Sequence, residues 1–389
     1  MKLCILSNQR LPTEKAYGLQ IAAMCSAFAQ GNDTTVELVY PTRTNRISSD
    51  VFAYYELPRA FAVHRVSAPD FQGDGIFERF VFGIKNILSA VALLRYALKR
   101  EVDVYYSRDE IVLYFLSFFR SSLAYEAHNF QQPRRVLYRR FIEHRVKVIA
   151  LTSRLRDDFV AFGFPSEDIL VAPDGVNSII IEREENNPAA PSMARDVLGI
   201  LPSKSIVVYA GSLYSWKGVY CLAAAARLLP DIEFIFVGGD QRGEEAQLRA
   251  YIQEQKISNC TITGYIQSQE RIRMYLAAAD VLVLPNTART RMSERYTSPL
   301  KLFDYMAAHR PIVASDLPSL RDILTHENAI LVGPDDASAL RDGIRKILDD
   351  KAFGVQLAER AFEDVHRYTW QKRAANILHF IGNTSPDVE

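Results

Sequence analysis

The sequence lacks several features that would assign a chain to a functional class at once. Its charge is balanced, with 46 Lys and Arg residues against 46 Asp and Glu residues, so no overall positive field is available to attract nucleic acid. Four cysteines are present, Cys4, Cys25, Cys221 and Cys260, and none of them forms a CxxC pair. We therefore expect buried free thiols, a reducing cytoplasmic environment and no nucleic-acid partner.

Metal and dinucleotide motifs are also missing. No Asp-x-Asp ends an expected strand, and no HExxH or Cys/His cluster occurs, so we expect no metal ion and no other cofactor. No GxGxxG follows the first expected strand, which argues against a dinucleotide-dependent oxidoreductase. The N-terminus has no signal-peptide pattern, and the most apolar long segment, 77–98, is interrupted by Lys85 and Arg95. On this pattern we expect neither secretion nor a membrane-spanning helix.

An alternation of strand and helix patterns is what the sequence does contain. The 389 residues are 48% hydrophobic and 24% charged, which is typical of a soluble chain with two globular cores. Short runs rich in Val, Ile and Tyr alternate with longer helical patterns, as in a parallel α/β sheet. The expected strands are 3–7, 36–40, 104–107, 124–126, 148–151 and 169–171, and then 206–210, 233–237, 260–263, 281–284, 312–315 and 329–332. This order predicts two Rossmann-like, doubly wound parallel sheets in tandem.

The two series of strands define the expected domains. A polar, proline-containing segment, 181–204, is the expected linker between an N-terminal domain, 1–180, and a C-terminal domain, 205–367. A last helix at about 368–389 could pack back on the first domain. Two such sheets that face each other would place the carboxyl ends of their strands around a shared cleft, where α/β proteins bind ligands.

The most informative motif begins a helix in the second domain. Ser298 is expected as its N-cap and Pro299 as its first residue, followed by Leu300. The unpaired N–H groups of such a helix end can bind a diphosphate, with Lys301 as an added donor and Asp304 facing a ribose. The alternative is that Lys301 and Asp304 are a surface pair on a well-capped helix.

Glycine-containing turns follow three strands of the same domain. After the strand at 206–210, Gly211 permits close backbone approach and Lys217 can meet a diphosphate as a point charge. Gly239 and Gly264 end two further strands. Each of these features is also compatible with ordinary turns and a solvated lysine.

These residues resemble the retaining glycosyltransferases of family 4, the glycosyl transferases group 1, which have the two-domain GT-B fold. The family signature pairs two glutamates with seven residues between them; Asp304 stands at the second position and Tyr296 at the first. Lys217 matches a family lysine, whereas Ser212 stands where an arginine is common. The resemblance implies that the loop of Gly264, Tyr265 and Ile266 contacts the nucleobase.

The resemblance also assigns two positions in the first domain. His128, which follows the expected strand at 124–126, corresponds to a histidine near the donor sugar and acceptor, although a lone histidine is more often structural. Gly18 belongs to a loop that resembles the family's first glycine-rich loop, near the diphosphate and acceptor.

The implied activity is transfer of a sugar from a UDP- or GDP-sugar to a glycan or lipid-linked acceptor, in cell-surface polysaccharide or glycolipid synthesis. The resemblance gives His128, Lys217 and Tyr296 catalytic positions and the other positions named above a role in donor binding. Two alternatives remain open, a nucleotide-sugar epimerase of the same fold and a degenerate nucleotide-sugar binding module.

Positive charge is concentrated in one part of the first domain. Residues 79–147 contain 13 basic and 6 acidic side chains, an excess of 13 − 6 = 7. In the first of two expected helices, Phe80, Ile84, Ile87 and Val91 lie on one side, and in the second, Arg135, Arg139 and Arg140 lie away from Leu137 and Phe141. Either these are ordinary helices with the apolar side toward the core, or they attach the protein to the cytoplasmic face of an anionic membrane.

Overall fold

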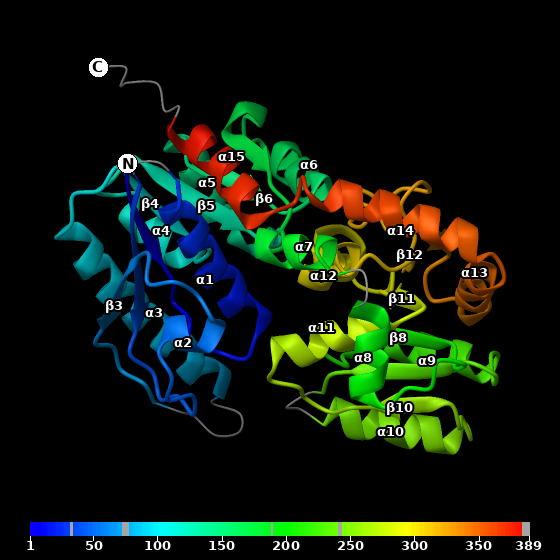
Figure 1. Cartoon of the computed structure of the whole chain (residues 1–389). Helices are drawn as coiled ribbons and strands as arrows, with labels where there is room; N and C mark the ends of the chain where they lie inside the picture. Colours follow the sequence, from blue (N-terminus) through cyan, green and yellow to red (C-terminus); the bar gives the residue numbers. More distant parts are fainter. Residues whose placement is uncertain (32–33, 72–77, 188–189, 240–242, 383–389) are drawn as a thin grey trace. The chain divides into compact units, whose positions relative to one another are not determined.

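The chain divides into two compact units in a computed structural model, which describes residues 1–31, 34–71, 78–187, 190–239 and 243–382. The first unit consists of residues 1–173 together with the segment that begins at Trp370, and the second runs from Asp174 to Thr369. Figure 1 shows the elements of both in chain order. The last helix, α15 (Trp370–Gly382), therefore belongs to the first unit, where it packs on α1 (Ala16–Ala29).

The first unit is built on a seven-stranded parallel sheet with the order β3-β2-β1-β4-β5-β6-β7. Its strands are β1 (Lys2–Leu6), β2 (Thr35–Pro41), β3 (Ala62–Val66), β4 (Val104–Ser107), β5 (Leu123–Ala127), β6 (Lys147–Ala150) and β7 (Ile169–Val171). Its further helices are α2 (Val51–Tyr55), α3 (Glu78–Leu98), α4 (Glu110–Leu116), α5 (Arg135–Glu143) and α6 (Ser153–Phe162). The strand order reverses between β1 and β4, and crevices at such a reversal are where α/β sheets bind ligands.

The second unit repeats this plan with a six-stranded parallel sheet in the order β10-β9-β8-β11-β12-β13. Its strands are β8 (Ile206–Ala210), β9 (Glu233–Val237), β10 (Cys260–Ile262), β11 (Val281–Leu284), β12 (Ile312–Ser315) and β13 (Ile330–Val332). Its helices are α7 (Ser178–Glu185), α8 (Ala190–Leu198), α9 (Val219–Arg227), α10 (Glu244–Glu254), α11 (Gln269–Ala278), α12 (Leu300–Ala307), α13 (Ala337–Asp349) and α14 (Lys351–Val365). Here the order reverses between β8 and β11. The prediction of two Rossmann-like parallel sheets is confirmed.

The segment expected as a linker, 181–204, is not one. It contains the end of α7 and the whole of α8, and both belong to the second unit. Asn177 caps α7 by accepting from the backbone N–H of Ile179, and α8 packs on α11. The Arg195 guanidinium on α8 lies 2.7 Å from the Asp280 carboxylate. The polar composition of this segment therefore reflects exposed helix faces, and the chain passes into the second unit at Asp174.

Helix α3 corrects one expectation and bears on another that the sequence left open. Segment 81–98 is long and apolar enough to cross a membrane, with a mean hydropathy of 1.5, even though it contains Lys85 and Arg95. Because α3 packs on β2, β3 and α4, we interpret it as a surface helix of the first unit. The sequence left open whether its apolar side faces the core or a membrane, and in the structure Ile84 and Ile87 on that side are exposed. Phe80, expected on the same face, lies outside the residues whose side chains are described.

Candidate functional site

The turn after β8 is fixed by glycines and a tyrosine. The Gly211 N–H donates to the carbonyl of Val237 on the neighbouring strand, and the Tyr209 hydroxyl donates to the carbonyl of Ser212 at 2.7 Å. Gly218 has a φ of 77°, and a Cβ there would collide with the carbonyl oxygen of Pro285. Glycine is therefore required at 218 for the turn to pass this close to the end of β11.

Two lysines lie together at this turn. The Lys217 ammonium stands 4.0 Å from the centroid of the Trp216 ring, and the Lys301 ammonium 3.7 Å from that of Tyr209. Burial lowers the pKa of Lys217 to about 8. Burial, with the positive charge of Lys217 adding to it, holds the pKa of Lys301 well below its usual range. The Lys301 Nζ is buried without any hydrogen-bond partner in the described residues. Two buried lysines in this state would both be stabilised by a nearby anion.

The start of α12 differs from the expected one. Pro299, and not Ser298, occupies the N-cap position, and the Ser298 hydroxyl accepts instead from the backbone N–H of Asp174 at 3.0 Å. The helix runs from Leu300 and carries both Lys301 and Asp304. Burial raises the pKa of Asp304 to about 6, against the opposing charge of Arg273. Asp304 is thus a partly desolvated carboxyl group one turn from Lys301.

Tyr296 is the last residue of a π-helical turn, Met292–Tyr296, and its side chain is buried. The Arg291 guanidinium lies 5.8 Å from the centroid of its ring. Glu294 accepts through its carbonyl from the N–H of Ser319, so this turn is tied to the segment after β12. The loop after β11 thus holds the Tyr296 phenol in position, and its correspondence to the family carboxylate stays a prediction.

The strand ends at Gly239 and Gly264 are in contact. Gly238 and Gly264 form an isolated antiparallel bridge, and a Cβ on Gly239 would lie 2.8 Å from the backbone nitrogen of Tyr265. Tyr265 is 60% exposed, and Ile266 packs in part on the core. Close backbone packing accounts for Gly239, and a φ of 74° accounts for Gly264. Contact of this loop with a nucleobase stays a prediction.

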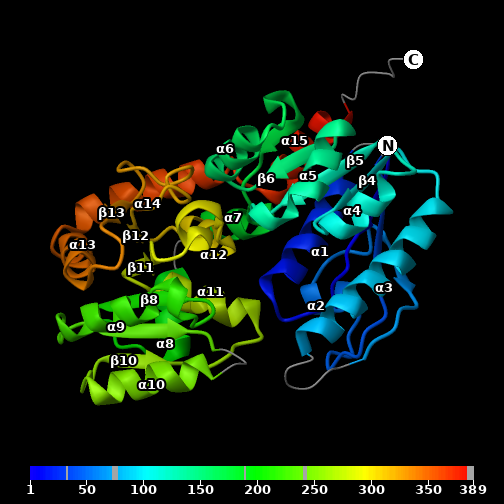
Figure 2. The ribbon, with the colours of Figure 1, turned by 180° about the vertical axis from the view of Figure 1, so that it is seen from behind.

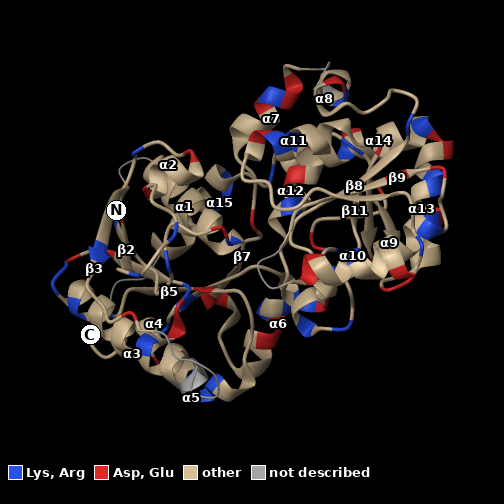
Figure 3. Ribbon diagram, turned by 90° about the horizontal axis from the view of Figure 1, so that it is seen from below, with Lys and Arg blue, Asp and Glu red and all other residues tan. Residues whose placement is uncertain are grey.

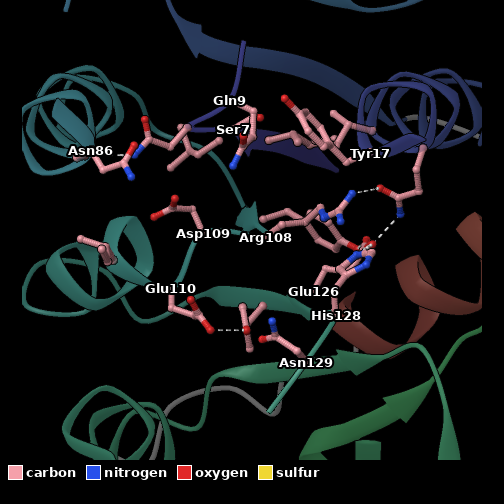
Figure 4. Close-up of a pocket in the computed structure, with 18 of the residues that line it drawn as sticks. Ser7, Gln9, Tyr17, Asn86, Arg108, Asp109, Glu110, Glu126, His128 and Asn129 are labelled. Atoms are coloured by element: carbon pink, nitrogen blue, oxygen red, sulfur yellow. Dashed lines mark hydrogen bonds and ion pairs between the residues drawn. The ribbon is translucent and has the colours of Figure 1, made fainter. Parts of the chain in front are cut away.

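The first unit has a cavity of about 330 Å³ at its own strand reversal. It is lined by residues that follow β1, β4 and β5, including Asn8, Arg108 and His128. The His128 Nε2 lies 2.8 Å from Oε1 of Glu126, a carboxylate that is 1% exposed (Figure 4). Burial, with the charge of Arg108 adding to it, lowers the pKa of His128 to about 4. The imidazole is therefore neutral at physiological pH.

Gly18 lies inside helix α1 and not in a loop. A Cβ at this position would collide with the hydroxyl of Tyr55, which donates to the carbonyl of Thr13 at 2.8 Å. Packing of α1 against this tyrosine thus accounts for the glycine, and a contact with the donor stays a prediction.

Glu126 and Arg108, which line the cavity, and Arg373, which is paired with Glu126, are not among the residues predicted from the sequence. A glutamate within a buried strand was the available signal, because a buried carboxylate requires partners. In the described parts of the chain, no group of three or more His, Cys, Asp and Glu side chains is placed to hold a metal ion.

The sequence is similar to known glycosyltransferases. Residues 204–350 match the family Glycosyl transferases group 1. The putative teichuronic acid biosynthesis glycosyltransferase TuaC of Bacillus subtilis is 23% identical over 62% of this chain and 57% of its own length. The phosphatidyl-myo-inositol mannosyltransferase of Mycolicibacterium smegmatis is 30% identical over 42% of this chain and 40% of its own length. The alignments thus span about half the length of these relatives.

Solved structures match the whole chain. Anabaena Alr3699/HepE in complex with UDP and glucose superposes with a TM-score of 0.73 and 19% identity, over 99% of this chain and 100% of that one. Sucrose-phosphate synthase from Thermosynechococcus elongatus has a TM-score of 0.78 and 20% identity, over 97% of both chains. At this identity the likeness establishes the fold, and the predicted GT-B fold is confirmed. The match to the glycosyl transferases group 1 covers residues 204–350.

Proposed function

Since the chain belongs to the glycosyl transferases group 1 family, we propose that it transfers a sugar from a nucleoside diphosphate sugar to an acceptor hydroxyl, with retention at the anomeric carbon. The solved relatives include a protein in complex with UDP-glucose, which favours a UDP-sugar as the donor.

The observation that carries this proposal is the pair of lysines at the strand reversal of the second unit. A buried ammonium without a hydrogen-bond partner is costly, and a second ammonium beside it adds repulsion. A diphosphate with its negative charges removes both costs at once, and the N–H groups at the start of α12 point to the same anion. Lys217 and Lys301 are therefore proposed to bind the two phosphates.

Lys301 also accounts for the missing arginine at position 212. Its side chain reaches from α12 to the turn after β8, where the Cδ and Nζ would lie 3.6 and 3.7 Å from a Cβ on Gly211. Many relatives are expected to carry a cationic side chain just after this glycine. In this chain Ser212 is exposed and its carbonyl is held by Tyr209. We infer that the second cation is supplied by a different element.

The chemical step follows from this arrangement. The acceptor oxygen forms a bond to the anomeric carbon as the bond from that carbon to the diphosphate oxygen breaks, and the hydroxyl proton passes to the departing diphosphate. Negative charge grows on the diphosphate, and preorganised cations stabilise it. Asp304 is proposed to accept hydrogen bonds from the ribose hydroxyls. Tyr296 takes the position beside the donor sugar where relatives have a carboxylate.

A panel of nucleotide sugars tests the proposal. The protein is incubated with UDP-, GDP- and ADP-sugars, with and without glycan and lipid-linked acceptors, and products are identified by mass spectrometry. A sugar-extended acceptor with release of nucleoside diphosphate is the expected result. Isomerised donor in the absence of acceptor would identify an epimerase, and binding without any product would identify a binding module.

Helix α3 favours a membrane-bound acceptor. The helix buries Ser89, Ala90, Leu93 and Ala97 and exposes Phe82, Ile84, Ile87 and Leu88, and only 22% of the apolar window 81–98 is buried. Phe119, in the turn that follows α4, is 57% exposed. Helices α3 and α4 pack together, and Figure 2 shows them side by side in the first unit. An apolar surface of this kind is unusual for a helix surrounded by water.

The charges around this surface favour an anionic bilayer as its partner. Lys85 on α3 is paired with Asp70 at 3.2 Å and is largely buried, so it does not contribute. Arg95 and Lys99 near the end of α3, and Arg135 and Arg139 on α5, are exposed. Figure 3 colours the ribbon blue at Lys and Arg positions. We propose that the apolar side chains enter the bilayer while these cations contact lipid headgroups on the cytoplasmic face.

A further inference from the structure

The first unit contains a buried carboxylate to which the transfer step above gives no role. Glu126, on β5, accepts hydrogen bonds from Gln20, Tyr106 and His128. The Arg373 guanidinium lies 3.4 Å from its Oε1, and both side chains are almost completely buried, with 1% and 3% exposed. Arg373 comes from α15, 247 positions further along the chain. The carboxylate is thus joined to a residue that only the last helix supplies.

Arg373 is fixed in this position by the backbone. Its Nε donates to the carbonyl oxygens of Ala172 and Pro173 at 3.2 and 2.9 Å. Burial alone would raise the pKa of Glu126, but the charge of Arg373 and the hydrogen bond from His128 hold that pKa well below its usual range. Glu126 is therefore ionised, and an ionised carboxylate can only accept hydrogen bonds.

The ionised carboxylate determines which nitrogen of His128 carries the proton. Because Glu126 cannot donate, the Nε2 that contacts it must be the N–H nitrogen. The ring is neutral, so Nδ1 carries a lone pair. Within the described residues Nδ1 has no hydrogen-bond partner, and His128 lines the cavity of about 330 Å³. The cavity thus presents an imidazole nitrogen that can only accept.

We propose that Arg373 is a positioning residue: it keeps Glu126 ionised, and Glu126 fixes His128 in the tautomer whose Nδ1 accepts a hydrogen bond from a hydroxyl group of the acceptor. The identity of this ligand rests on the proposed function, whereas the tautomer is a property of the free protein. The charged groups that face the ring are Glu126 on β5, Arg108 after β4 and Arg373 on α15.

The tautomer can be read directly by NMR. In protein with 15N-labelled histidine, the ring nitrogen shifts at neutral pH distinguish Nε2–H from Nδ1–H, and loss of a signal in His128→Gln assigns it. The wild type is expected to show Nε2–H alone. Arg373→Gln should give a mixture of tautomers, while Arg373→Lys, which keeps the charge, should restore the wild-type pattern. Lys372→Met, an exposed neighbour on α15, is the matched control and should change nothing.

Two results would overturn the inference: a wild-type ring protonated on Nδ1, or a folded Arg373→Gln variant with the wild-type tautomer. If Arg373→Gln does not fold, Glu126→Gln removes the same ion pair from the other side, and it must then show the mixture.

Kinetics provide a second readout. With the donor and acceptor found by the panel, Arg373→Gln should lower kcat by about tenfold, the equivalent of one hydrogen bond, with an unchanged KM for the donor. Arg373→Lys should recover most of this loss. If the wild type transfers no sugar, the proposed function is wrong. The NMR experiment still tests the role of Arg373, because the tautomer is a property of the free protein.

Discussion

At the scale of single residues, the decisive feature is the pair of lysines, because the burial of their ammonium groups in the free protein predicts that they bind a diphosphate. Lys217→Ala should lower turnover by roughly 10²–10³-fold, since the departing diphosphate loses one of its stabilising charges. Lys301→Met should have a similar effect. Lys351→Ala, an exposed lysine of the same unit, is the control. Steady-state kinetics on the identified donor measure all three, and near-normal turnover in Lys217→Ala would place that residue outside the site.

The depressed pKa values of the two lysines predict that nucleotide binding takes up protons. Near pH 8 the free protein has Lys217 about half protonated, the pKa of Lys301 is also held well below its usual range, and a bound diphosphate raises the pKa of both. Calorimetry of UDP binding at this pH, in buffers of different ionisation enthalpy, should show net uptake of protons. Affinity should therefore rise as the pH falls from 9 to 7. A binding enthalpy that is independent of the buffer would contradict the assignment.

Protonation of Asp304 should weaken UDP binding as the pH falls, which is opposite to the effect expected from the lysines. The Asp304 pKa of about 6 means that the carboxylate takes up a proton as the pH falls through this value, and it then accepts hydrogen bonds from a ribose less well. Asp304→Asn should weaken UDP binding at pH 7.5 by roughly 1.5–3 kcal/mol and should also remove this acid limb. Titration calorimetry at pH 5.5 and 7.5 tests both effects. Equal affinity of variant and wild type at both pH values would refute the ribose contact.

At the scale of elements, α3 presents an apolar side to the outside, which predicts attachment to membranes. The protein should float with vesicles rich in anionic lipid and not with neutral ones, and salt should release it. Replacement of Ile84, Ile87 and Leu88 by Gln should abolish flotation, as should Arg135→Glu with Arg139→Glu. Nucleotide affinity should stay unchanged. Arg140 is left intact because it bonds Ser117 and lies 3.9 Å from the centroid of the Phe118 ring.

A matched control separates membrane insertion from a general loss of apolar surface. Val197 and Leu201 in the second unit are 68% and 62% exposed, and their replacement by Gln should leave flotation intact. If the wild type does not float at low salt, α3 has a different partner, and a soluble acceptor becomes the better hypothesis.

The elements also show what a sequence can predict. All twelve expected strands are present, and most of them are short buried runs, whereas the edge strand β3, AVHRV, was missed because only its last residue is buried. The orientation of α3 could not be predicted, because periodicity identifies an apolar face without saying what covers it. Lys217 and Asp304 could be identified from local motifs. The contact of Glu126 with Arg373 joins positions 247 apart, and no local pattern indicates it.

At the scale of the whole molecule, the donor site is expected to work without a metal ion. Lys217, Lys301 and the amides at the start of α12 supply the positive charge that a diphosphate requires. Transfer activity should therefore persist in excess EDTA, measured as nucleotide release after removal of divalent ions. Complete loss of activity that Mg²⁺ or Mn²⁺ restores would show that a cation completes the site.

The path of the chain has a further consequence for the order in which the protein is made. The chain enters the second unit at Asp174 and leaves it at Thr369, where Val176 and Thr369 pair directly. The second unit is thus one continuous segment, while the first is interrupted and needs α15 for completion. During synthesis the second unit can fold on the ribosome while the first still lacks its last helix. Since Arg373 follows the whole second unit in the sequence, the cavity around His128 acquires its native charge state only after that unit has been synthesised.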